Sequence, residues 1–325
     1  MTFANPSRPS TAAVAIALLI VYVVWGSTYL GIAVMIETLP PLLAAGVRYA
    51  AAGVLMLGAL AAYARLRRGA EPVERPTLAN WRAALIVGTL LLLGGNGGVV
   101  LAELFIPSGI AAVLVATEPI WLALFDSILS RRRPSGLVIG GLTAGILGVV
   151  ILVAPVEGVA EVDPLGIVLV VGATISWTAG SLYARNAPLP RSPLLGTGLE
   201  MLGGGAMLLL VGGLLGEIGR TDVSAFSLRS VLALAYLIVF GSLIAFTAYT
   251  WLLANVPIST VSTYAYVNPI VAVALGAVLL QEPITPRTLV ATVIIIGAVI
   301  AMVSGRPREP EESGPVPEAF RRQPE

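Results

Sequence analysis

Long apolar stretches dominate this chain, and short segments containing Pro, Gly or Arg separate them. A helix needs about 20 mainly apolar residues to cross the hydrocarbon core of a bilayer. Ten stretches come close to this length, so the pattern predicts an all-α integral membrane protein with ten transmembrane helices. The predicted helices cover residues 12–35, 42–64, 82–103, 108–130, 136–154, 164–184, 194–216, 229–253, 258–280 and 286–304.

The second half of the chain repeats features of the first at an interval of about 150 residues. Pro107 recurs as Pro257 after 150 residues, and Trp25 recurs as Trp177 after 152 residues. Each half holds five predicted helices, and an odd number makes the second half enter the membrane from the opposite face. Inverted repeats are typical of secondary transporters. We therefore expect a first five-helix repeat over residues 1–155, a second, inverted repeat over residues 156–305 and a disordered cytoplasmic tail over residues 306–325.

Composition and charge agree with a membrane protein. Hydrophobic residues make up 57% of the chain and charged residues 11%, whereas soluble domains have about 25% charged residues. Fifteen of the 19 Arg fall on one side of the predicted topology and three on the other, which predicts that both termini are cytoplasmic. The chain has no His and no Cys, which excludes disulfides, thiol catalysis and Cys/His zinc sites. We expect neither a cofactor nor a metal ion.

Two polar residues are predicted at the middle of the membrane. Glu118 and Asn268 each lie 11 residues beyond the equivalent prolines Pro107 and Pro257. A helix rises about 1.5 Å per residue, so this distance is roughly 16 Å, half of the hydrocarbon core. A following proline loosens the helix at each position. Glu118 either contacts a substrate ammonium or carries an exchangeable proton, or it bonds a neighbouring helix at a kink.

Arg48 and Glu200 occupy equivalent positions of the two repeats and have opposite charges. Inverted symmetry places them on opposite sides of the membrane, so we expect no direct ion pair. Arg48 lies near the start of its helix, and the simpler interpretation is that its side chain reaches the lipid headgroups. Contact with substrate or with a gate is the alternative. Glu103 is expected at the external interface and Asp126 at the cytoplasmic one.

Aromatic residues and one amide complete the candidate site. Several Trp and Tyr residues lie deep inside predicted helices, where they either pack or contact substrate through stacking and cation–π interactions. Asn96 lies in a Gly-rich run inside a helix, where Gly94 and Gly98 predict close helix packing. The candidate substrate-binding residues are Trp25, Ser27, Tyr29, Asn96, Glu118, Pro119, Trp121, Trp177, Tyr249, Tyr264, Asn268 and Pro269.

Several of these segments resemble a known family. They are the run WGSTYLG in the first predicted helix, FIPSGIAA before the fourth, and the EP and NP pairs in the fourth and ninth. Together they resemble the EamA family of the drug/metabolite transporter superfamily over residues 12–304. The resemblance implies a central cavity lined by helices one, three, four, six, eight and nine. It also implies a bacterial inner-membrane exporter of amino acids, similar to the aromatic amino acid exporters.

We therefore expect a secondary exporter of amino acids or related metabolites and drugs that works by alternating access. Its partners would be a small-molecule substrate and the lipid bilayer, without nucleic acid, and it would be a monomer or weak oligomer. Transport is either passive or coupled to protons. The alternatives are a nucleotide-sugar or other metabolite exchanger, a channel and a membrane enzyme. An enzyme is disfavoured because the helices lack a nucleophile with a base.

Overall fold

The computed structural model describes residues 9–66, 74–129, 131, 133, 136–153, 162–261 and 263–304, so the predicted tail over residues 306–325 lies outside it. The described part is all-helical and contains no strand, as the sequence predicts. Seven helical segments are long and apolar enough to cross a membrane, and three shorter apolar helices accompany them. The ten predicted stretches thus correspond to seven long and three shorter helices, and ten membrane crossings stay a prediction.

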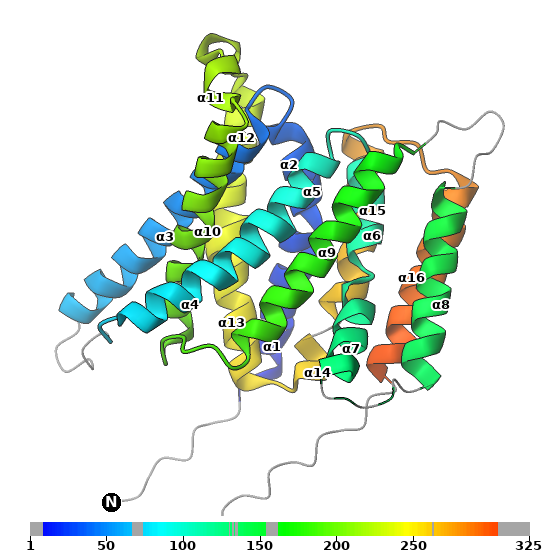
Figure 1. The fold of residues 1–325 in the computed structure, drawn as a ribbon, viewed down its shortest axis with the longest axis horizontal. Helices are drawn as coiled ribbons and strands as arrows, with labels where there is room; N and C mark the ends of the chain where they lie inside the picture. The colour runs from blue at the N-terminus through cyan, green and yellow to red at the C-terminus, as the bar shows by residue number, and fades with distance from the viewer. Residues whose placement is uncertain are drawn as a thin grey trace, which may run out of the picture.

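Three of the long segments, Thr11–Met35, Leu78–Ala102 and Leu228–Asn255, contain a π-helical stretch between two α-helical ones. Figure 1 shows how the elements are arranged. The first half contains α1 (Thr11–Ile20), η1 (Val21–Trp25), α2 (Gly26–Met35), α3 (Pro41–Leu66), α4 (Leu78–Gly88), η2 (Thr89–Gly97), α5 (Gly98–Ala102), α6 (Ser108–Val115), α7 (Glu118–Leu129) and α8 (Gly136–Val153). The second half contains α9 (Pro164–Ala184), α10 (Pro193–Leu214), α11 (Glu217–Arg220), η3 (Val223–Ala225), α12 (Leu228–Tyr236), η4 (Leu237–Ile244), α13 (Ala245–Asn255), α14 (Ile258–Val261), α15 (Tyr264–Leu279) and α16 (Pro286–Ser304).

Local features of the backbone recur between the two halves. Arg131 and Gln281, 150 residues apart, are the described non-glycine residues with positive φ, at 52° and 57°. Wide π-helical turns occupy η2 in the third predicted helix and η4 in the eighth. The halves differ at their central prolines, because Glu118 starts a new helix whereas Pro269 lies inside α15.

Helices α3, α4, η2 and α5 pack closely on helices of the second half because glycines remove the side chains between them. Helix α3 lies along α10 (Figure 1), and a Cβ atom on Gly205 would come within 2.6 Å of the amide nitrogen of Ala50. The prediction for Gly94 and Gly98 is confirmed. A Cβ on Gly98 would lie 2.9 Å from Cβ of Ala173, and one on Gly94 would overlap the hydroxyl of Ser176, both on α9.

Acidic side chains accept hydrogen bonds from the backbone amides at the starts of two helices. The carboxylate of Glu217 accepts hydrogen bonds from the backbone amides of Leu42 and Leu43, at 3.1 and 2.8 Å, at the start of α3. Glu282 does the same for α6, accepting from the amides of Ser108 and Gly109 at 2.8 and 3.1 Å. Unpaired amides and the positive end of the helix dipole both favour an anion there.

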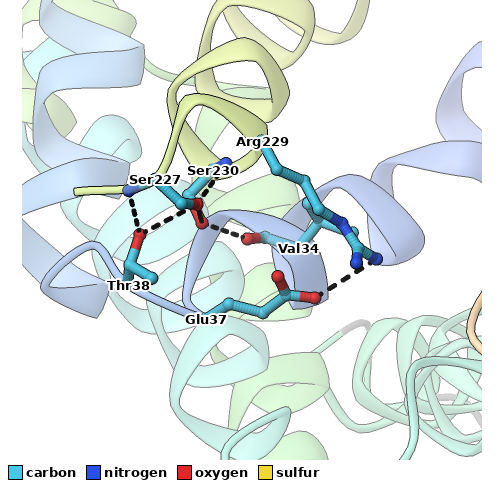
Figure 2. A network of polar contacts seen from close by, with 6 residues as sticks. All are labelled: Val34, Glu37, Thr38, Ser227, Arg229 and Ser230. Atoms are coloured by element: carbon cyan, nitrogen blue, oxygen red, sulfur yellow. Dashed lines mark hydrogen bonds and ion pairs between the residues drawn. The ribbon is translucent and has the colours of Figure 1, made fainter. Parts of the chain in front are cut away.

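A polar network joins the end of α2 to the start of α12 (Figure 2). The amide of Ser227 donates to the hydroxyl of Thr38 at 3.0 Å, and the hydroxyl of Ser230 donates to the carbonyl of Val34 at 2.8 Å. An ion pair of 3.3 Å between Arg229 and Glu37 lies beside these bonds. The network lies at the end of the molecule opposite to the start of α1 (Figure 1).

Candidate substrate cavity

Two adjoining cavities lie between the two halves of the chain. The inner cavity has a volume of about 140 Å³ and is lined by η1, α2, α3, η2, α5, α6, α7, α9, α13 and α15. The second cavity, of about 550 Å³, reaches the connection between α9 and α10, where Arg185 and Pro190 border it. The two share a border that includes Trp25, Glu118 and Trp177. A passage from one end of the molecule thus leads towards its centre.

Most of the candidate residues come together at these cavities. The inner cavity is bordered by Trp25, Tyr29, Asn96, Glu118, Pro119, Trp177, Tyr264, Asn268 and Pro269, and the second by Tyr249 as well. The two midplane residues predicted from the repeat, Glu118 and Asn268, therefore face the same space. Whether any of these residues contacts a substrate stays a prediction.

Trp25 is the centre of an aromatic cluster at the border of the two cavities. Its ring lies 5.1 Å from Phe246, 5.0 Å from Tyr249 and 5.3 Å from Tyr264, measured between ring centroids. The indole nitrogen donates to the carbonyl of Gly241 at 3.2 Å. Gly241 belongs to the π-helical segment η4. The rings of this cluster therefore border the cavities while the indole nitrogen of Trp25 has a hydrogen-bond partner.

The interpretation that Arg48 reaches the lipid headgroups is wrong. Arg48 is only 3% exposed and lines the inner cavity. Its Nε donates to the hydroxyl of Ser242 at 3.0 Å, and its guanidinium carbon lies 4.6 Å from the ring centroid of Tyr49. Among the described residues it has no ion-pair partner. The helix α3 turns this residue towards η4 rather than towards lipid.

Glu200 lines the second cavity and not the inner one, and no ion pair joins it to Arg48 within the described residues, as the inverted repeat predicts. Asp126, expected at an interface, pairs with Arg185 at 2.7 Å, and both side chains are about half exposed. Asn268 is buried, and its amide faces the carbonyl oxygens of Tyr264 and Tyr22 at 3.3 and 3.2 Å. These carbonyls fix which atom of the amide is the nitrogen.

Two candidate residues lie away from both cavities. The hydroxyl of Ser27 donates to the carbonyl of Val24 at 2.8 Å and lies 2.5 Å from that of Tyr236. Trp121 donates to the hydroxyl of Thr117 at 3.3 Å. Their sequence neighbours Thr28 and Leu122 do line a cavity. Only one face of each helix borders the space, so adjacent residues point in different directions.

Sequence reasoning also missed residues that line the inner cavity, among them Thr28, Thr174 and Arg48. Small hydroxyl residues are common in membrane helices, so the two Thr gave no signal. Arg48 did give one, because a charge inside an apolar helix is a functional candidate by default. Arg48 was instead assigned to the lipid headgroups, because it lies near the start of its helix and a side chain there can reach the membrane interface.

The fold and the cavity define an integral membrane protein built to hold a small molecule between two halves of one chain. Comparison with known proteins identifies the family within this class. The sequence profile of the EamA-like transporter family matches residues 12–154 and again residues 164–304. A protein of Escherichia coli strain K12 named "Uncharacterized inner membrane transporter YedA" is 38% identical over 292 residues, covering 89% of this chain and 90% of that protein.

More distant relatives and a solved structure agree. The "Probable amino-acid metabolite efflux pump" of the same E. coli strain is 22% identical, covering 88% of this chain and 93% of that protein. One crystal structure aligns with a TM-score of 0.60 at 18% identity over 90% of this chain and 96% of that chain, which shows the fold alone. The chain belongs to the EamA-like transporter family, as the sequence resemblance indicated, and is a multi-pass inner membrane transporter.

Proposed function

We propose that the chain exports amino acids, including aromatic or other apolar ones, or related small metabolites and drugs, by alternating access. In this proposal residues 1–155 and 156–305 are two five-helix repeats of opposite orientation, with both termini in the cytoplasm. The cavity between them opens to one side of the membrane at a time. The relatives named as amino-acid metabolite efflux pumps support this substrate class.

The observation that carries the proposal is the pair of opposite charges in one cavity. The guanidinium group of Arg48 and the carboxyl group of Glu118 both line the inner cavity, together with the rings of Trp25 and Tyr264. A free amino acid has a carboxylate and an ammonium group at neutral pH. Arginine binds carboxylates through paired hydrogen bonds, and an ammonium group is attracted by a carboxylate or a ring face. An apolar side chain would lie against the rings.

The two ends of the molecule along the helix direction differ, and this difference supports alternating access. The second cavity reaches the connection between α9 and α10, at the same end as the start of α1 (Figure 1). At the opposite end, Glu217 and Glu282 hold helix starts, and the network around Ser227 joins α2 to α12 (Figure 2). In the proposed cycle the cavity is loaded from the end of the molecule where α1 starts, and the polar contacts at the other end open for release.

A nucleotide-sugar exchanger is the main alternative. Arg48 at the inner cavity is a basic group of the kind that would bind the diphosphate of such a substrate. At the inner cavity, where Arg48 and Glu118 lie, size favours the amino acid, because its volume of about 140 Å³ is below the range of about 300 to 1,000 Å³ for pockets that take drug-sized ligands. The adjoining second cavity, of about 550 Å³, is large enough for the bigger substrate.

Counterflow in proteoliposomes tests the proposal. Vesicles preloaded with unlabelled phenylalanine should accumulate labelled phenylalanine transiently, because a carrier exchanges substrate across the membrane. Phenethylamine lacks the carboxylate and 3-phenylpropionate lacks the ammonium group, so each should compete much more weakly than phenylalanine. Absence of counterflow with a panel of amino acids would reject the substrate class. Flux without acceleration by internal substrate would indicate a channel.

The role of Glu118 requires its own test. We expect Glu118→Gln to weaken counterflow and, if protons are coupled through this carboxyl, to remove the pH dependence of transport. Glu200→Gln is the matched control, because Glu200 lines the second cavity only. Transport with an unchanged pH profile in Glu118→Gln would exclude coupling through Glu118.

A further inference from the structure

Glu103 differs from every other described acidic residue in the way that it is buried. It follows directly after α5, and neither of its carboxylate oxygens has exposed surface or a hydrogen-bond partner within the described residues. The sequence expectation of an external interface group is therefore wrong for its polar atoms. The nearby Glu282 shows the contrast, since its carboxylate accepts three hydrogen bonds at the start of α6.

The charged and titratable groups around Glu103 come from α2, from α3 and from the connection between α15 and α16. Arg48 and Glu282 interact with its carboxyl electrostatically, and Tyr29 on α2 interacts with it as well. Tyr49 lies beside Arg48 on α3. The other elements packed on α5 are α9 and η2, and neither contains an acidic or basic residue. Arg48 is therefore the positively charged residue among these neighbours of Glu103. No ion pair joins the two side chains within the described residues.

An ionised carboxylate needs hydrogen-bond donors or a paired cation when it is taken out of water. Glu103 has neither in this conformation, and the negative charge of Glu282 adds repulsion. A carboxyl that holds a proton does not carry this penalty. The position of Arg48 connects Glu103 with the cavity, because Arg48 lines the inner cavity and its helix α3 packs on α5, which Glu103 follows.

We propose that Glu103 is a proton-binding site of the transporter, separate from Glu118, and that Arg48 controls its occupancy. The proton comes from water and binds one carboxylate oxygen of Glu103 when the end of the molecule at which Glu282 holds the start of α6 is closed. It returns to water when the end opens and the carboxylate is hydrated. A substrate carboxylate at Arg48 would neutralise the guanidinium and favour the protonated form of Glu103. This last step rests on the proposed amino-acid substrate, whereas proton binding by Glu103 does not.

Infrared spectroscopy of the purified full-length protein, titrated from acid to alkaline pH without substrate, tests proton binding. A protonated carboxyl has a carbonyl stretch distinct from the bands of a carboxylate. At neutral pH the wild type should show this band, and Glu103→Gln should lack the component assigned to Glu103. Glu37→Gln is the control, because Glu37 is a partly exposed carboxyl in an ion pair. Glu118→Gln should also retain the Glu103 component.

The link to Arg48 has a separate readout. Arg48→Gln should shift the midpoint of the Glu103 band upward by about one pH unit or more, because removing a nearby cation favours the protonated form. An unshifted midpoint would remove Arg48 from the proposal. A spectrum of Glu103→Gln identical to the wild type in the protonated-carboxyl region would overturn proton binding. Glu103→Asp, which keeps a carboxyl and should move the band without removing it, covers the case in which the Gln variant does not fold.

Discussion

The crossing of α4 and α10 depends on two glycines, and replacing one of them gives a sharp test of the packing. A Cβ atom on Gly88 would lie 2.3 Å from the carbonyl oxygen of Glu200 and 2.8 Å from the amide nitrogen of Gly204. A Cβ on Gly204 would in turn lie 2.6 Å from the carbonyl oxygen of Gly88. These neighbours are helix backbone atoms, so a side-chain rotation does not relieve the overlap. Gly88→Ala therefore has to separate the two helices.

The expected change in the free energy of unfolding for Gly88→Ala follows from two opposing effects. Alanine favours a helix over glycine by about 1 kcal/mol. Inserting a methyl group into a packed interface costs about 1 to 3 kcal/mol, and the short distances to backbone atoms place Gly88→Ala in the upper part of that range. We expect a net loss of about 1 to 2 kcal/mol in the free energy of unfolding. Gly58→Ala on α3 is the matched control, because a Cβ there has no neighbour within 4 Å. It should be neutral or stabilising.

Thermal unfolding in one detergent, followed by tryptophan fluorescence, measures the difference between the two variants. Gly88→Ala should unfold at a lower temperature than the wild type, and Gly58→Ala at the same or a higher temperature. The double variant Gly88→Ala/Gly204→Ala should lose less than the sum of the single losses, because one separation of the helices accommodates both methyl groups. Equal midpoints for Gly88→Ala and Gly58→Ala would refute the close crossing of α4 and α10.

Three further predictions concern single side chains. Glu217→Ala should lower the free energy of unfolding by about 1 kcal/mol, because it removes the acceptor for the first amides of α3, and Glu217→Gln, which keeps one acceptor oxygen, is the control and should lose less. Trp25→Phe keeps an aromatic ring but loses the bond to a carbonyl of η4, so it should cost about 1 kcal/mol in thermal unfolding and leave counterflow measurable. Arg48→Gln should reduce phenylalanine counterflow at least about tenfold, since a hydrogen bond to a charged group contributes about 1.5 to 3 kcal/mol; near-normal counterflow would remove Arg48 from the site.

Much of the site was readable from the repeat. The spacing of Glu118 and Asn268 from equivalent prolines placed both at mid-depth, and the structure brings both to the inner cavity. Trp25 and Trp177, also equivalent, border both cavities. The placement at mid-depth rests on the fixed rise per residue of a helix, which converts sequence distance into depth, and it stays a prediction.

Depth alone does not say which way a side chain points. Ser27 and Trp121 lie on cavity-lining helices but face away from the cavities, and Arg48 faces inward although its depth suited the headgroups. The direction of each residue depends on how the helix is rotated and on what covers it. Wide turns in η4 bring Ser242 to Arg48, and this contact joins residues 194 positions apart.

The sequence by itself determined the class of protein and the apolar segments, and it predicted an inverted repeat and the depth of the polar residues. Those properties follow from hydrophobic length and from the spacing of prolines, which are local along the chain. Only the tertiary structure decided that Arg48 and Glu118 share one cavity and that Glu103 is buried without a partner. The surroundings of a buried charge come from helices distant in sequence, so apolar patterning does not contain them.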